Sequence, residues 1–138
     1  VDQWLFWQVA GFGPMAGQAN HFRNSAPDRI GYAIDRYTSE VARLYGVLDR
    51  QLKDRDYIAG KYSIADIAAY PWARRWKTLG QDIDAFPHVK TWLDRVGSRP
   101  AVMRGMEVGH DFAGERASLS QDAEPQKIRL GNKPKRKK

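Results

Sequence analysis

The clearest pattern in the chain is a long stripe of apolar positions that follows residue 27. Its members recur at alternating spacings of four and three residues: Ile30, Ile34, Tyr37, Val41, Leu44, Leu48 and Leu52. That spacing predicts one face of an α-helix of about 27 residues. Ser25, Pro27 and Asp28 at its head are typical of a helix start. The opposite face carries Arg36, Glu40, Arg43, Asp49, Arg50 and Lys53.

A second helix is predicted over residues 62–76, and it is apolar around most of its circumference. Ser63 and Asp66 have the three-residue spacing of a capping box, and Tyr62 and Ile67 occupy the positions of a hydrophobic staple. Pro71 predicts a kink. A helix that is apolar nearly all round belongs inside a bundle, so we expect this one to be central and buried.

Residues 2–22 form another predicted helix, with a wide aromatic face that includes Trp4, Trp7 and Phe12. Rings this large require a deep groove or a partner surface to cover them. Glycines and Pro14 interrupt the segment at residues 11–17. A phosphate-cradling loop is one interpretation, but no strand precedes it and no Lys-Ser/Thr pair follows. A kinked helix packed tightly on a neighbour is the interpretation we favour.

Residues 86–96 and the segment after Pro100 predict two further helices, and no strand-like alternation is found anywhere. The expected fold is therefore all-α, a bundle of five to six helices. We assign residues 1–109 to the helical domain. Residues 110–138 are expected to form a disordered basic tail, because they hold too little apolar surface to offset the entropy of ordering.

Charge and composition narrow the possible functions. The formal net charge of the 138 residues is +7. Residues 127–138 contain seven lysines and arginines and no acid, so the rest of the chain is electrically balanced. Cysteine is absent, which excludes disulfides and cysteine nucleophiles. Because no leader and no long apolar run is found, we expect a cytoplasmic protein without membrane contact, and the missing initiator Met suggests that a segment precedes Val1.

No catalytic or metal-binding constellation emerges from the residue pattern. His21, His88 and His110 lie in unrelated segments without metal-ligand spacing. Asp35 and Glu40 stand beside arginines, as in ordinary helix ion pairs. The tryptophans sit at core-like spacings without interleaved basic residues, which favours packing over a stacking platform for nucleic acid. We therefore predict neither catalytic residues nor a metal in this chain.

Four segments together resemble a known family. They are QWLFWQVAGFGPMAGQANHF (3–22), AIDRYTSEVARLYGVLDRQL (33–52), YSIADIAAYPW (62–72) and FPHVKTWLDRVGSRPAV (86–102). They are similar to the C-terminal domain of Nu-class bacterial glutathione transferases, and to the related nitrogen-regulator prion proteins of fungi. The resemblance covers roughly residues 2–107 and extends the all-α expectation to that family's helical half.

The resemblance implies an enzyme of which this chain is only one part. In the family, a thioredoxin-like N-terminal domain that this chain lacks precedes the helical domain, so the chain alone is expected to be inactive. The full-length protein would be a homodimer that reduces disulfides or transfers glutathione to small molecules, with glutathione as cosubstrate. Gln3 and Arg36 match positions that contribute to the glutathione pocket, where a guanidinium suits a carboxylate and an amide both donates and accepts.

A different class of function also stays open. A helical domain of this kind can serve as a non-enzymatic interaction module whose basic tail binds nucleic acid or another acidic partner. The positive charge lies in the tail and not on the predicted bundle, which makes nucleic acid the less expected partner.

Overall fold

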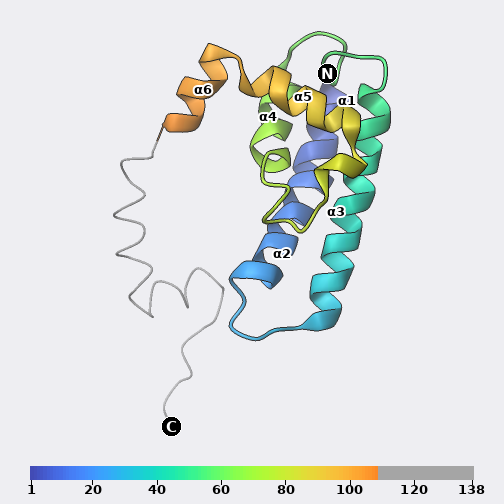
Figure 1. Ribbon diagram of the computed structural model, residues 1–138, viewed down its shortest axis with the longest axis vertical. Helices are drawn as coiled ribbons and strands as arrows, with labels where there is room; N and C mark the ends of the chain where they lie inside the picture. Colours follow the sequence, from blue (N-terminus) through green and yellow to red (C-terminus); the bar gives the residue numbers. More distant parts are fainter. Residues whose placement is uncertain (109–138) are drawn as a thin grey trace. The chain divides into compact units, whose positions relative to one another are not determined.

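The computed structural model describes residues 1–108, and residues Val1–Met103 form one compact unit built from helices (Figure 1). The α-helices are α1 (Asp2–Trp7), α2 (Gly13–Asn24), α3 (Gly31–Leu52), α4 (Ile64–Ala73), α5 (Pro87–Gly97) and α6 (Pro100–Glu107). A π-helical segment, Gln8–Phe12, joins α1 to α2, and a 3-10 turn, Ile83–Ala85, precedes α5. The described residues contain no β-strand, which confirms the all-α prediction.

Two expectations concern parts of the chain that lie outside this description. The basic tail, residues 110–138, and the predicted domain boundary at residue 109 belong to residues that the structure does not describe, so both stay predictions. Within residues 1–108, none of the helices combines the length and the apolar character needed to cross a bilayer.

The first predicted helix is continuous but changes its winding in the middle. Pro14 has no N–H to donate into the preceding turn, and the five residues just before Gly13 wind as a π-helix. Close packing at this point is confirmed: a Cβ on Gly13 would lie 2.8 Å from Gln8 Nε2 and 3.1 Å from Trp72 Nε1. The segment is helical throughout, so the phosphate-loop interpretation is wrong.

The long helix α3 starts later than predicted. It begins at Gly31, because residues 25–30 form the turn that reverses the chain between α2 and α3. At that turn the backbone N–H groups of Ser25 and Ala26 both donate to the carbonyl of His21. Figure 1 shows α2 and α3 side by side. The C-terminal half of the stripe is buried, whereas Ile30 at its head remains 48% exposed.

The capping box at the start of α4 is confirmed, but the helix is not buried all round. Ser63 Oγ accepts from Ala65 N at 3.3 Å, and Ser63 N donates to Asp66 Oδ2 at 3.0 Å. The face with Ala65, Ala69 and Ala73 is buried, whereas Ile64 and Ile67 are each 52% exposed. The apolar pattern therefore covers two surfaces, of which one packs inside this chain and the other lies at its surface.

Asp66 connects α4 to two other segments. Its carboxylate is fully buried, and Oδ1 accepts both the backbone N–H of Ile58 at 3.0 Å and the indole Nε1–H of Trp92 at 2.9 Å. Trp92 on α5 is itself fully buried. The carboxylate that caps α4 therefore also fixes the loop after α3 and the orientation of α5.

Two further polar contacts fix α3 in the bundle. The hydroxyl of Tyr45, which is fully buried, donates to the carbonyl of Ala73 at 2.7 Å. Asp49 was predicted on the solvent face, but its carboxylate accepts the backbone N–H groups of His88 and Val89 at 2.9 and 3.1 Å. It caps α5 and is a structural residue, because the first N–H groups of a helix have no partner within that helix.

Removing the Asp66 carboxylate should cost far more stability than removing the Ser63 hydroxyl. Ser63→Ala loses one cap bond, which is worth about 1 kcal/mol. Asp66→Ala leaves two buried donors and one partly buried donor without a partner, at a cost of about 3–5 kcal/mol. Urea unfolding checks both values, with Asp84→Ala as an exposed control. Equal effects of the two substitutions would contradict the central role of Asp66.

Tyr45 should make the protein less stable in alkali. Burial raises the pKa of its phenol above the usual value of 10, so ionisation favours the unfolded chain. The contribution is intact below pH 10 and is lost as the pH rises beyond it. Between pH 8 and pH 11, the free energy of unfolding of the wild type should fall by about 1.4 kcal/mol more than that of Tyr45→Phe. Parallel unfolding curves for both proteins at each pH give this difference, and its absence would contradict the prediction.

Candidate functional site

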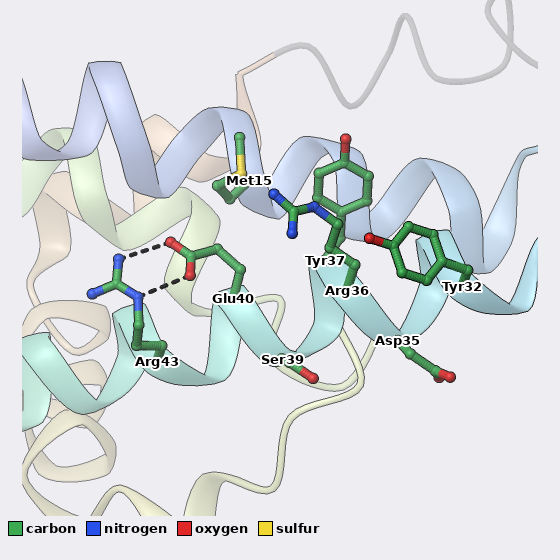
Figure 2. A pocket seen from close by; sticks show the side chains of 8 residues that line it. All are labelled: Met15, Tyr32, Asp35, Arg36, Tyr37, Ser39, Glu40 and Arg43. Atoms are coloured by element: carbon green, nitrogen blue, oxygen red, sulfur yellow. Dashed lines mark hydrogen bonds and ion pairs between the residues drawn. The ribbon is translucent and has the colours of Figure 1, made fainter.

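A pocket of about 730 Å³ lies along the N-terminal half of α3, on the side that faces α2 (Figure 2). Met15 of α2 lines one side. The other lining residues all come from α3: Tyr32, Asp35, Arg36, Tyr37, Ser39, Glu40 and Arg43. A pocket of this volume falls in the range that small-molecule ligands occupy. Of the two predicted glutathione-contacting residues, it contains Arg36.

Helical spacing brings the polar side chains of α3 together. Tyr32, Arg36, Glu40 and Arg43 follow one another at four, four and three residues, so they share one face of the helix. The ring of Tyr37 stacks on Phe22 of α2, with centroids 5.5 Å apart and planes inclined by 6°. The stack couples α2 to α3 at the pocket and fixes the position of one of its walls.

Of the two arginines that line the pocket, one forms an ion pair within the described residues and the other does not. Arg43 binds Glu40 through two parallel contacts, Nη2 to Oε1 at 2.7 Å and Nε to Oε2 at 2.8 Å. The Arg43 hydrogen bond lowers the pKa of Glu40, and the positive charge of Arg36 acts in the same direction. Arg36 itself forms no ion pair with any residue of the described part of the chain. In Figure 2 its guanidinium lies beside Met15 and Tyr37, whereas Asp35 points away.

This arrangement suits recognition of an anion more than bond-breaking chemistry. An exposed guanidinium with a planar donor fork matches a carboxylate, and the phenols of Tyr32 and Tyr37 add hydrogen-bonding groups. The lining contains no His, and the chain has no Cys. Among residues 1–108 no three His, Asp or Glu side chains come together as a metal site requires.

The structure does not bring Gln3 to this pocket. Gln3 is exposed in the first turn of α1 and does not line the cavity. From Gln3 to Met15 the helical path runs 12 residues, or roughly 18 Å at 1.5 Å per residue. Gln3 therefore lies about three helical turns before Met15, the α2 residue that lines the pocket.

Sequence reasoning missed most of the pocket. Tyr37 was interpreted as a residue of the apolar stripe, Met15 as part of the kink in the first helix, and Glu40 as a member of an ordinary helix ion pair, while Tyr32 was not singled out. The spacing of Tyr32, Arg36 and Glu40 was a usable signal, because three polar side chains share a helix face there. Met15 comes from another helix, and no local pattern indicates which helix faces α3.

A second, more polar concavity of about 470 Å³ lies between the loop after α3 and the start of α5. Lys53, Arg55 and Arg95 line it together with Asp54 and Asp56. Arg95 is already engaged, because its guanidinium contacts the carboxylate and the carbonyl of Asp56, each at 3.0 Å. Because this concavity holds charges of both signs, some of which are already paired, it favours no particular ligand.

Comparison with known families identifies the helical unit. Residues 31–100, half of the chain, match the family described as "Glutathione S-transferase, C-terminal domain". The chain belongs to this glutathione S-transferase family. The match begins at the first residue of α3 and includes the pocket wall, α4 with its capping box, and α5.

Curated relatives extend the match to both groups that the sequence resembles. The disulfide-bond oxidoreductase YfcG of Escherichia coli K12 is 51% identical over 100 residues, covering 72% of this chain and 46% of YfcG. The transcriptional regulator URE2 of Saccharomyces cerevisiae is 32% identical over 140 residues, covering 77% of this chain and 40% of URE2. The resemblance to the bacterial enzymes and to their fungal relatives is confirmed.

Solved structures of the glutathione S-transferase family share the fold. A glutathione transferase from Burkholderia graminis, crystallised with two glutathione molecules per protein subunit, superposes with a TM-score of 0.72 at 38% identity. The alignment covers 78% of this chain and 48% of that one. The chain thus spans about half the length of the relatives that it matches.

Proposed function

We propose that this chain is the helical half of a glutathione transferase whose full-length protein reduces disulfides with glutathione. The observation that carries the proposal is the guanidinium of Arg36 in the α2–α3 pocket, which forms no ion pair with any of residues 1–108. Glutathione has two carboxylates, and a guanidinium fork is the side chain best matched to one of them. The similarity to a bacterial disulfide-bond oxidoreductase and to a transferase crystallised with glutathione supports the same assignment.

The chemistry can proceed through glutathione alone. One glutathione thiolate attacks a sulfur of the substrate disulfide, which forms a mixed disulfide and releases one substrate thiol after protonation. A second glutathione thiolate then attacks the glutathione sulfur, which gives oxidised glutathione and the second substrate thiol. This route requires no cysteine in the chain, in keeping with the sequence. Two glutathione molecules per subunit in the Burkholderia graminis structure match that stoichiometry.

Two partners belong to the proposal, a thioredoxin-like N-terminal domain and a second copy of the protein. The position of Gln3 outside the pocket that contains Arg36 supports the second copy, because the Gln3 of one subunit would then join the Arg36 of the other at a shared site. Exposed apolar side chains support partners of this kind: Phe6, Val9, Ile64 and Ile67 are 71%, 60%, 52% and 52% exposed. We place the protein in the cytoplasm, where glutathione is kept reduced.

Arg36→Gln should weaken glutathione binding to the full-length protein by about tenfold or more, because a charged hydrogen bond to a carboxylate is lost. Calorimetric titration with glutathione measures the affinity, and turnover of a small-molecule disulfide measures the consequence. Arg50→Gln is the matched control, since Arg50 is an exposed arginine of α3 outside the pocket. Equal affinity in wild type and Arg36→Gln would remove Arg36 from the binding site, and failure of the wild type to bind glutathione would remove the proposed function.

The full-length protein should sediment as a homodimer, and the dimer should be required for tight glutathione binding. Phe6→Asp combined with Val9→Asp puts two charges on the exposed apolar face of α1 and the π-helical segment, and is expected to raise the monomer fraction or weaken domain contact. Sedimentation velocity and glutathione titration on the same samples separate these outcomes. A monomer that binds glutathione as tightly as the dimer would contradict a shared site.

A further inference from the structure

Two arginines of α3 stand on either side of one carboxylate, and only one of them uses it. Glu40 lies four residues after Arg36 and three before Arg43, so both guanidinium groups can reach it along the helix surface. Arg43 occupies both carboxylate oxygens, at 2.7 and 2.8 Å. Arg36 is close enough for its charge to act on Glu40, yet it forms no ion pair within the described residues.

No other acid in the pocket wall can take the place of Glu40 as a partner of Arg36. Asp35 is its neighbour in sequence but points away from it in Figure 2. The facing helix, α2, contains no acidic residue, and its contribution to the pocket is the uncharged Met15. Whether Arg36 is free to meet a ligand therefore depends on which arginine holds Glu40.

We propose that Arg43 is a positioning residue, which holds the Glu40 carboxylate so that Arg36 remains available to an anionic ligand. This proposal rests on the proposed function, in which that ligand is a carboxylate of glutathione. A guanidinium that is already bound by a carboxylate on two sides has to lose those contacts before it can bind another one. Arg43 prevents this competition and needs no contact with the ligand.

The full-length protein allows a direct test with glutathione as the probe. Arg43→Gln should weaken glutathione binding about two- to fivefold, because a helix ion pair between Arg36 and Glu40 then competes with the ligand. In steady state the change should raise KM for glutathione and leave kcat unaltered. The double variant Arg43→Gln, Glu40→Gln should restore the affinity, and Glu40→Gln alone should bind glutathione at least as tightly as wild type.

Rescue separates positioning from the other roles that Arg43 could have. If Arg43 contacted glutathione itself or supported the fold, the double variant would bind as weakly as Arg43→Gln, and the proposal would be overturned. Weaker binding by Glu40→Gln would overturn it as well, since that result would make Glu40 a ligand contact and not a competitor.

A measurement without ligand distinguishes failure of this inference from failure of the proposed function. Nitrogen-15 NMR of the arginine side chains reports pairing as slower guanidinium rotation and slower exchange of Nε–H with water. The Arg36 signal should slow in Arg43→Gln and recover in the double variant, while Arg95, paired with Asp56 at 3.0 Å, should be slow in all proteins. An Arg36 signal that is unchanged across the variants overturns the positioning role. The expected NMR changes, combined with absent glutathione binding, would support it and refute the proposed function alone.

Discussion

The fold depends most on one buried carboxylate. Asp66 makes a local contact as the reciprocal partner of Ser63 in the capping box of α4. Its second oxygen accepts the N–H of Ile58 and the indole of Trp92, which lie 8 and 26 residues away. A buried charge is tolerated only when hydrogen bonds surround it, and each of these donors would be costly to leave unpaired. The start of α4, the preceding loop and α5 are therefore fixed by the same group.

The pocket uses the rigidity that this arrangement provides. Tyr45 ties the middle of α3 to the end of α4, and Asp49 ties its last turns to α5. With that half of α3 held, its N-terminal half extends along α2, and the stack of Tyr37 on Phe22 fixes the spacing between the two helices. The exposed polar side chains of the pocket are therefore carried by helices whose positions are fixed, which a precise binding site requires.

Features that depend on residues close together in the sequence could be predicted, whereas features that depend on distant residues could not. The capping box was predictable because Ser63 and Asp66 are three residues apart, and the stripe of α3 because helical spacing is local. The first residue of α3 was not predictable, because the turn after α2 determines it and Pro27 lies within that turn. Asp49 was interpreted as solvent-exposed because its partners lie about 40 residues further along the chain. Arg36 became a candidate through family resemblance, and no periodicity distinguishes it from Arg50.

The proposed glutathione site extends beyond this helical unit. The pocket is lined by α3 and by Met15 of α2, and all of its charged side chains come from α3. In the proposed function, the Arg36 guanidinium binds one of the two carboxylates of glutathione, and Gln3 does not line the pocket that contains Arg36. The remaining contacts require other surfaces. The half-exposed Ile64 and Ile67, on a helix whose opposite face is fully buried, offer an apolar area that such a surface could cover. Under the proposed function, α3 supplies the anion-binding part of the site, and the proposed partner surfaces supply the rest.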